Sequence, residues 1–215
     1  IIGSLLFSTL IWCRYDISYV WIVIFVTLGF GLIGFIDDFS KLHNNNTRGI
    51  SGKIRLFLGF LIAACATIWV ISIQDPSLSK SLAVPIFKDV LFNLGWFYIP
   101  FSMIVIVGSA NSVNLTDGLD GLAIMPVMIA SGSLGIIAYA VGRVDFSNYL
   151  EVHYIAGSGE IAVFSAALIG AGLGFLWYNA PPAAVFMGDT GSLALGGALG
   201  AISVCTKHEI VLAII

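Results

Sequence analysis

The segment from Asn111 to Gly121 holds the densest group of side chains that could do chemistry. It reads Asn-Ser-Val-Asn-Leu-Thr-Asp-Gly-Leu-Asp-Gly, so two carboxylates, two carboxamides and two glycines fall within eleven residues. Carboxylates bind hard cations such as Mg²⁺, and glycine amides can approach phosphate oxygens closely. Charge-free runs lie on both sides of the segment, at residues 90–116 and 121–142. We therefore expect a metal and phosphate site where the chain leaves a membrane and turns back.

A second acidic group, Asp37 and Asp38, follows the apolar run of residues 17–36. One interpretation is a solvated helix end. Against it, the helix macrodipole disfavours negative charge at a C-terminus, and adjacent carboxylates stay ionised most easily near cations. Basic residues follow closely in the sequence: Lys41, Lys53 and Arg55. This combination favours a site for a phosphate and a divalent cation.

A third candidate, Asp189, lies between Gly188 and Gly191, shortly after Phe186. Taken alone, Asp189 could be a simple helix N-cap, because Asp is favoured at that position. The flanking glycines, however, leave the backbone free to approach a ligand closely. An exposed Phe186 could stack on a base, so both interpretations stay open.

The composition indicates an integral membrane protein. Hydrophobic residues make up 59% of the chain and charged residues 10%, with a mean hydropathy of +1.02, whereas an average soluble domain is roughly 25% charged. In lipid, only helices and closed barrels satisfy their own backbone, and the apolar runs lack the alternation of barrel strands. We therefore predict an all-α fold, a polytopic transmembrane helical bundle.

Apolar runs of roughly 20 residues, the length that spans a bilayer, recur along the chain. Counting them predicts about seven to eight helices, out of roughly ten in a complete bundle. They are expected at residues 1–13, 17–36, 56–74, the later part of 90–116, 121–142, 161–178, 190–206 and from 210 onward. Residues 83–87 could form a strand of a short β-hairpin outside the membrane. Pairs of glycines four residues apart predict close helix packing: 170 with 174, and 196 with 200.

The distribution of basic residues orients the predicted bundle. Residues 37–55 hold four of the nine Lys and Arg residues, so the positive-inside rule places this loop in the cytoplasm. Alternating crossings then bring all the candidate acids to the same face: Asp37, Asp38, Asp117, Asp120 and Asp189. This shared face predicts one composite site at the cytoplasmic surface.

Both ends of the sequence lie within apolar runs. The chain opens at Ile1 without an initiator Met, and it stops within residues 210–215. We therefore expect a single integral-membrane domain over residues 1–215 that is truncated at both ends.

Three motifs of this chain together resemble a known family. They are Gly34-Phe35-Ile36-Asp37-Asp38, the segment from Asn111 to Ala123, and Phe186-Met187-Gly188-Asp189-Thr190-Gly191-Ser192. In this order they closely resemble the phospho-N-acetylmuramoyl-pentapeptide-transferase family. That family is a bacterial branch of the polyprenyl-phosphate N-acetylhexosamine-1-phosphate transferase superfamily. The resemblance covers essentially the whole chain.

The resemblance implies transfer of phospho-MurNAc-pentapeptide from UDP-MurNAc-pentapeptide to undecaprenyl phosphate, with release of UMP and formation of lipid I. This reaction is the first membrane step of peptidoglycan synthesis, and the resemblance implies that it needs Mg²⁺. The implied partners are the two substrates, the lipid bilayer and, as an open alternative to a monomer, a second copy in a homodimer; nucleic acid is not expected. The implied location is the bacterial inner (cytoplasmic) membrane, with the active site on its cytoplasmic face.

The same resemblance implies roles for individual residues. Asp189 matches the Mg²⁺ ligand, and Asp37, with Asp38 beside it, matches the carboxylate that deprotonates or positions the lipid phosphate. Lys53 matches a lysine near the diphosphate, which completes the implied catalytic set. The implied substrate-binding residues are Asn111, Asn114, Asp117, Gly118, Leu119, Asp120, Asn179 and Phe186. Phe186 is expected to stack on uracil. Direct attack by the lipid phosphate and a covalent aspartyl intermediate both stay open.

Two alternative functions stay open. The first is transfer of N-acetylglucosamine-1-phosphate from UDP-GlcNAc to a polyprenyl phosphate, the reaction of the sister branch, whose loop usually differs at the positions of Leu115 and Thr116. The second is a cation-coupled membrane transporter, since carboxylates in membrane proteins often mark ion paths. Transporter acids usually lie near the midplane, whereas the acids of this chain are expected in loops at one surface.

Overall fold

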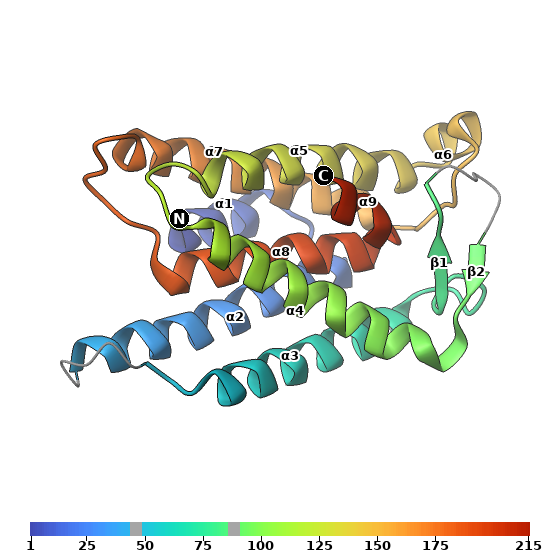
Figure 1. The fold of residues 1–215 in the computed structure, drawn as a ribbon. Helices are drawn as coiled ribbons and strands as arrows, with labels where there is room; N and C mark the ends of the chain where they lie inside the picture. Colours follow the sequence, from blue (N-terminus) through green and yellow to red (C-terminus); the bar gives the residue numbers. More distant parts are fainter. Residues whose placement is uncertain (44–48, 86–90) are drawn as a thin grey trace.

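The computed structural model describes residues 1–43, 49–85 and 91–215. Within these ranges the chain is a bundle of helices with one small hairpin (Figure 1). The helices are α1 (Ile2–Trp12), α2 (Ser18–His43), α3 (Gly52–Ile73), α4 (Tyr98–Thr116), α5 (Ile124–Val141), α6 (Val144–Leu150), α7 (Ile161–Asn179), α8 (Gly188–Thr206) and α9 (Glu209–Ile214). Two 3-10 turns, η1 (Gly95–Phe97) and η2 (Ser158–Glu160), precede α4 and α7. The predicted helical class is confirmed.

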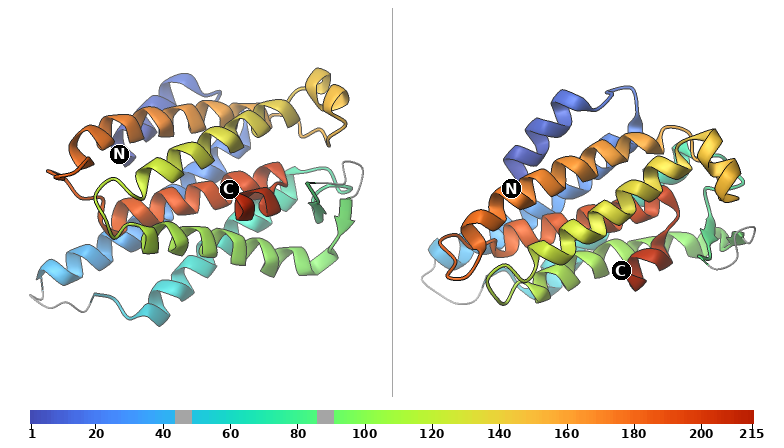
Figure 2. Two further views of the ribbon diagram at one scale, coloured as in Figure 1. Left: turned by 45° about the horizontal axis from the view of Figure 1, so that its top comes forward. Right: turned by 90° about the horizontal axis from the view of Figure 1, so that it is seen from above.

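The long helices lie side by side and extend lengthwise through the molecule, with some neighbours crossing at an incline (Figures 1 and 2). Among the described residues, five helical segments are long and apolar enough to cross a membrane: Ser18–His43, Gly52–Ile73, Gly95–Thr116, Ile124–Val141 and Ser158–Asn179. The chain is therefore an integral membrane protein. The predicted span at 210 onward is present as the short α9, and α1 covers eleven residues of the first predicted span.

Helix α8 is the central helix of the bundle. Every residue from Gly191 to Thr206 is buried, because α2, α4 and α5 pack around it (Figure 2). A helix that contacts protein on all sides can carry glycine, serine and alanine in place of large apolar side chains. This position explains why the sequence of α8 is less hydrophobic than those of its neighbours.

The predicted close packing of small residues holds for one glycine pair and fails for the other. A Cβ added at Gly196 would lie 2.5 Å from Ser109 O, and one at Gly200 would lie 2.7 Å from the Cα of Ile106, so α8 and α4 touch through their backbones. The residues at 170 and 174 of α7 have nothing within 4 Å of an added Cβ. On α7 the close contact is made instead by Gly172, which packs against Met128 of α5.

One of the long helices extends further than the sequence indicated. Helix α2 was expected to end at residue 36 and continues to His43. No glycine or proline interrupts it there, Lys41 pairs with Asp37 one turn earlier, and cations in a last helical turn are favoured by the macrodipole. Helix α4 ends at Thr116, as the predicted span does, so Asn111 and Asn114 lie in its last turns and Asp117 follows directly after it. The candidate acids therefore lie on helix ends as well as in loops.

The predicted hairpin is confirmed, with different bounds. Strands β1 (Ser81–Ala83) and β2 (Leu91–Asn93) pair antiparallel, with Leu82 opposite Phe92. Of the predicted run 83–87, Ala83 is in a strand, and residues 86 and 87 lie outside the described part of the chain. The hairpin lies at the right-hand end of Figure 1, far from the start of α8.

Candidate metal and phosphate site

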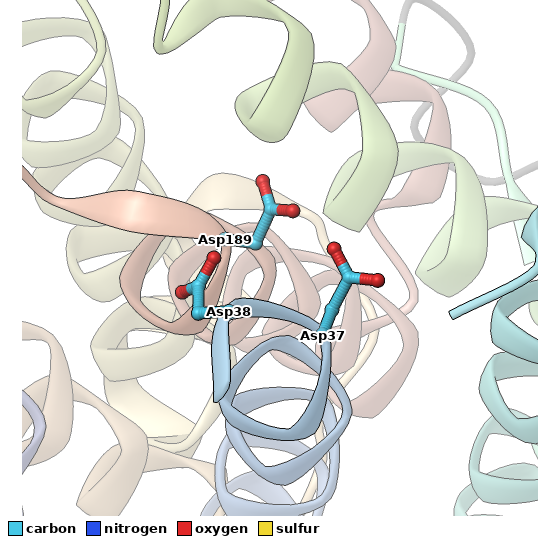
Figure 3. A group of neighbouring side chains, drawn as sticks. All are labelled: Asp37, Asp38 and Asp189. Atoms are coloured by element: carbon cyan, nitrogen blue, oxygen red, sulfur yellow. The ribbon is translucent and has the colours of Figure 1, made fainter. Parts of the chain in front are cut away.

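Three carboxylates meet where the end of α2 touches the start of α8 (Figure 3). Asp37 and Asp38 come from α2 and Asp189 from α8, and one oxygen of each lies within 4.8 Å of the other two. The helices can come this close because Gly34 of α2 has no side chain: an added Cβ would overlap the backbone carbonyl of Asp189. The structure thus joins the first and third acidic motifs of the chain.

Within the described part of the chain, two basic side chains reach this cluster of carboxylates. Lys41 Nζ lies 2.7 Å from Asp37 Oδ2, 2.6 Å from Asp189 Oδ2 and 3.8 Å from Asp38 Oδ1. Arg55, in the first turns of α3, has Nη1 3.7 Å from Asp189 Oδ2. Among the residues that the structure describes, three carboxylates thus face two cations, and this excess of negative charge favours a divalent cation.

Neighbouring side chains fix the orientation of two of these acids. Asp38 Oδ2 accepts hydrogen bonds from Thr190 N at 3.0 Å and Thr190 Oγ1 at 2.8 Å. Asp189 Oδ1 accepts from Asn114 Nδ2 at 2.6 Å, and the same amide nitrogen donates to Ser192 Oγ at 2.8 Å. The carboxylate of Asp189 therefore contacts Asn114 and Lys41. The N-cap interpretation of Asp189 is wrong, because Met187 is the N-cap of α8 and makes no side-chain cap bond.

A cavity of about 260 Å³ opens beside the cluster. It joins all three acidic motifs, since α2, the end of α4 with the turn after it, and the start of α8 each contribute to its wall. The lining residues are Asp38, Asn114, Asp117, Gly118, Leu119, Asp120, Asn179, Phe186, Gly188 and Asp189. All the predicted substrate-binding residues except Asn111 are in this set.

Two hydrogen-bonded links hold the far wall of the cavity in shape. Asn179 Oδ1 accepts from Gly121 N at 3.0 Å, while its Nδ2 donates to Val185 O at 2.8 Å. Asp120 Oδ2 accepts from Ala183 N at 3.0 Å. These bonds join the turn after α4 to the loop before α8, so Asn179 and Asp120 shape the wall by tying two loops together.

Asp117 and Phe186 present the chemically distinctive groups of that wall. Burial, and secondarily the negative charge of Asp189, raise the pKa of the Asp117 carboxyl above its usual value. Phe186 has 72% of its surface exposed while lining the cavity. An exposed aromatic ring at the mouth of a polar cavity is suited to stack on a flat heterocycle.

The donor set fits a hard divalent cation. Carboxylate oxygens are the ligands that Mg²⁺ prefers, and Mg²⁺ is commonly held by one or two carboxylates together with substrate phosphates. Asp38 and Asp189 face the cavity, and the Lys41 ammonium among the three acids indicates that the cluster stabilises positive charge. Asp189 and Asp38 are thus the residues that could hold such a cation beside the cavity.

Three predicted site residues lie outside the cavity lining. Asp37 belongs to the carboxylate cluster but is buried behind it. Lys53 is exposed in the first turn of α3, and Asn111 donates to Val107 O of its own helix at 2.8 Å. Among the described residues, the cations that contact the cluster are Lys41 and Arg55, two of the three basic residues that the sequence indicated, whereas the resemblance had singled out Lys53. The continuation of α2 to His43 puts Lys41 on the same helix face as Asp37 and Asp38, since i,i+3 and i,i+4 neighbours share a helix face.

Comparisons with known proteins agree with this arrangement. A family model described as glycosyl transferase family 4 matches residues 20–207. The chain is 68% identical over 215 residues to the phospho-N-acetylmuramoyl-pentapeptide-transferase of Ruegeria sp. (strain TM1040). It is 66% identical to the proteins of the same name from Ruegeria pomeroyi and Dinoroseobacter shibae. These alignments cover 100% of this chain and 60% of each relative, so the chain spans about three fifths of their length.

The family match includes all the elements that build the site. Residues 20–207 contain most of α2, all of α3, α4 and α8, and every residue that lines the cavity. The carboxylate cluster, the cavity and the matched region therefore coincide, and this chain belongs to glycosyl transferase family 4.

Proposed function

We propose that the full-length protein carrying this chain transfers phospho-MurNAc-pentapeptide from UDP-MurNAc-pentapeptide to undecaprenyl phosphate, giving lipid I and UMP. The observation that carries the proposal is the joining of Asp38, Asp189 and Asn114 beside a cavity with Phe186 at its mouth. That arrangement supplies a cation site, hydrogen-bond donors and a base-stacking surface in one place. The names of the relatives support the choice of the muramoyl substrate over N-acetylglucosamine.

The proposed reaction exchanges one phosphoryl linkage for another. An oxygen of the lipid phosphate bonds to the sugar-bearing phosphorus of the nucleotide, the bond from that phosphorus to the bridging oxygen breaks, and UMP leaves with that oxygen. A phosphomonoester has a second pKa near 6, so the attacking oxygen is largely deprotonated at neutral pH without a protein base. Direct attack is therefore our proposed course.

The protein would contribute positioning and charge, which are the main requirements of phosphoryl transfer. A divalent cation held by Asp189 and Asp38 would neutralise charge on the diphosphate. Lys41 and Arg55 would face the same phosphates from the far side of Asp189. Asn114 would keep Asp189 oriented, and Phe186 would stack on uracil. Asp117, Asp120 and Asn179 would close the cavity around the nucleotide.

The position of the site suits a reaction between a soluble nucleotide and a membrane lipid. The acids lie at helix ends, where a lipid phosphate at the membrane surface can reach them while its chain stays in the bilayer. We assign this face to the cytoplasm of a bacterial inner membrane, because residues 37–55, from the end of α2 to the start of α3, hold four of the nine Lys and Arg residues. Residues 1–215 would be one integral-membrane transferase domain. A homodimer remains a prediction.

The test uses the full-length protein in detergent with UDP-MurNAc-pentapeptide and undecaprenyl phosphate, and measures UMP. We expect UMP release that requires both Mg²⁺ and the lipid phosphate. Release without the lipid would contradict direct attack and indicate an enzyme-bound intermediate. Activity with UDP-GlcNAc in place of the muramoyl nucleotide would assign the protein to the sister reaction, and no release with either nucleotide would overturn the proposal.

A further inference from the structure

Asp37 differs from the other two acids of the cluster in its surroundings. Only 3% of the residue is exposed, whereas the side chains of Asp38 and Asp189 are 32% and 20% exposed. Asp38 and Asp189 line the cavity and Asp37 does not. A buried carboxylate must be satisfied by donors from the protein itself, and the structure identifies such a donor for each oxygen.

The two donors come from opposite sides of Asp37. Oδ1 accepts from the backbone N–H of Ile50 at 2.7 Å, and Oδ2 lies 2.7 Å from Lys41 Nζ. Ile50 directly precedes Ser51, the N-cap of α3, whose side chain accepts from Ile54 N. Asp37 thus ties the last turns of α2 to the first residues of α3.

Gly49 makes this contact possible. A Cβ added at Gly49 would overlap Asp37 Oδ1 and would lie 2.7 Å from its Cγ and 2.9 Å from Oδ2. All three atoms belong to a short side chain that Lys41 and Ile50 already hold in place, so it has little room to move. Gly52, three residues further along, has nothing within 4 Å of an added Cβ. The need for glycine is therefore specific to position 49.

We propose that Asp37 is a positioning residue, and that Asp37, Gly49 and Ile50 form a latch that sets Lys41 and Arg55 against Asp189. The proposal rests on the proposed function, and it gives Asp37 a different role from a group that touches the lipid phosphate. Asp38 and Asp189 are then the acids that face the substrates.

The geometry explains how the latch would act. Arg55 follows Ser51 by one turn of α3, and its Nη1 lies 3.7 Å from Asp189 Oδ2. The direction in which α3 starts therefore decides whether the Arg55 guanidinium reaches Asp189. Lys41 stands between Asp37 and Asp189, at 2.7 and 2.6 Å, so losing Asp37 removes one of the two anchors that centre its ammonium. Both cations depend on the same buried carboxylate.

The experiment compares Gly49→Ala with the matched control Gly52→Ala in the full-length protein, together with Asp37→Ala, Asp37→Asn and the double variant Asp37→Ala/Gly49→Ala. The first readout is the rate of amide hydrogen exchange in peptides that contain the Ile50 amide, measured by mass spectrometry. The second is UMP release, separated into kcat and KM for the nucleotide. The first readout does not depend on the reaction.

We expect the Ile50 amide to exchange at least about tenfold faster in Gly49→Ala and Asp37→Ala, as for loss of a hydrogen bond to a charged group. Gly52→Ala should exchange as the wild type does. Asp37→Asn keeps an oxygen that can accept from Ile50, so it should retain protection. Turnover should fall in kcat with little change in nucleotide KM, and Asp37→Asn should keep more activity than Asp37→Ala.

The double variant gives the sharpest outcome. Asp37→Ala removes the oxygens that the new Cβ of Gly49→Ala would meet, so Gly49→Ala should have no further effect on exchange or turnover in that background. Equal effects in both backgrounds would overturn the latch, as would a Gly49→Ala protein that behaves like Gly52→Ala. An Asp37→Asn protein as inactive as Asp37→Ala would also overturn the latch, because Asp37→Asn keeps the acceptor for Ile50 N and would then fail through its lost charge alone.

Failure of the latch and failure of the proposed function lead to different results. If the Ile50 amide responds as expected but the wild type releases no UMP, the latch stands and the proposed reaction is wrong. If the wild type releases UMP but the amide exchanges equally in all variants, the reaction stands and Asp37 does not position α3.

Discussion

Lys41 changes the interpretation of the acidic residues around it. Three carboxylates this close would repel one another, and an ammonium within 2.7 Å of two of them offsets that repulsion. Lys41 lies three and four residues after the adjacent acids, on the same face of α2. A bound divalent cation would share these carboxylates with Lys41, so the lysine and the cation would act on the same phosphates.

Asp189 gives the first prediction at the scale of a single residue. Asp189→Asn keeps an oxygen for Asn114 but loses the negative charge that holds a cation. Since metal stabilisation is worth several kcal/mol, Mg²⁺-dependent UMP release should fall at least about a hundredfold. The protein should stay folded, because Asp189 lies in the first turn of α8 with a partly exposed side chain. The exposed Asp145→Asn serves as the control, and full activity of Asp189→Asn would refute the metal assignment.

Phe186 gives a second prediction at the residue scale. Phe186→Ala should weaken binding of uridine nucleotides by about 1–3 kcal/mol, the usual worth of stacking an aromatic side chain on a base. Isothermal titration with the nucleotide measures the change. Trp177→Ala is a matched control, because Trp177 is 83% exposed but does not line the cavity. Equal affinities for wild type and Phe186→Ala would place the base elsewhere.

At the scale of elements, the length of α2 positions the acids. Its 26 residues span about 39 Å at 1.5 Å per residue, which exceeds a hydrocarbon thickness of about 30 Å. The last two turns can therefore extend past the lipid chains and carry Asp37, Asp38 and Lys41 into the polar surface layer. Helix α8 meets them with its first turn, so the site is formed by one helix ending and another beginning.

The backbone contact of α8 with α4 carries a prediction at the same scale. Gly196→Ala would place a Cβ 2.5 Å from Ser109 O and 2.7 Å from the Cα of Ala110, which forces the two helices apart. Overpacking of this kind typically lowers the free energy of unfolding by about 1–3 kcal/mol. Thermal unfolding in detergent measures the change. Gly170→Ala, which has open space, should unfold like the wild type, and equal midpoints for both variants would contradict the assigned contact.

At the scale of the whole molecule, the end of α8 opposite the site is also held by polar side chains. Thr206 O accepts from His153 Nε2 at 2.9 Å and from His208 Nδ1 at 2.7 Å, and the two rings lie 5.1 Å apart. The Lys207 side chain is fully buried and donates to Ser79 O at 2.8 Å. Both ends of the central helix are therefore anchored to other elements, the site end by carboxylates and the far end by imidazoles and a lysine.

The partly buried imidazole of His208 predicts a dependence of stability on pH. Burial, and secondarily the charge of His153, lower the pKa of His208 from 6.5 to about 4. Below pH 6.5 the unfolded chain therefore takes up a proton that the folded protein does not, so stability present above pH 6.5 is lost as the pH falls toward about 4.

The slope of that loss reaches at most about 1.4 kcal/mol per pH unit for one group. Unfolding midpoints measured between neutral and mildly acidic pH should fall for the wild type and fall less for His208→Gln. The exposed His43→Gln should follow the wild type. A His208→Gln protein with the wild-type dependence would contradict the lowered pKa of the His208 imidazole.

Much of the fold and of the site could be predicted from the sequence. Long charge-free runs require helices in lipid, and this requirement is local to each run. The three acidic motifs carry their chemistry in residue types that lie close along the chain. Most of the predicted cavity residues, including Asn114, Asp120 and Phe186, do line one cavity.

The tertiary structure decided how each side chain is used. Successive helical residues point about 100° apart, so only the rotation of α2 against α8 places Asp38 in the cavity and Asp37 behind it. Lys41 and Arg55, rather than Lys53, reach Asp189 because α2 continues past residue 36 and α3 starts at an angle fixed near Ile50. The sequence by itself determined the helical membrane fold and the chemistry of its acidic motifs. Which acid lines the cavity and which cation contacts Asp189 depended on contacts between helices distant in sequence.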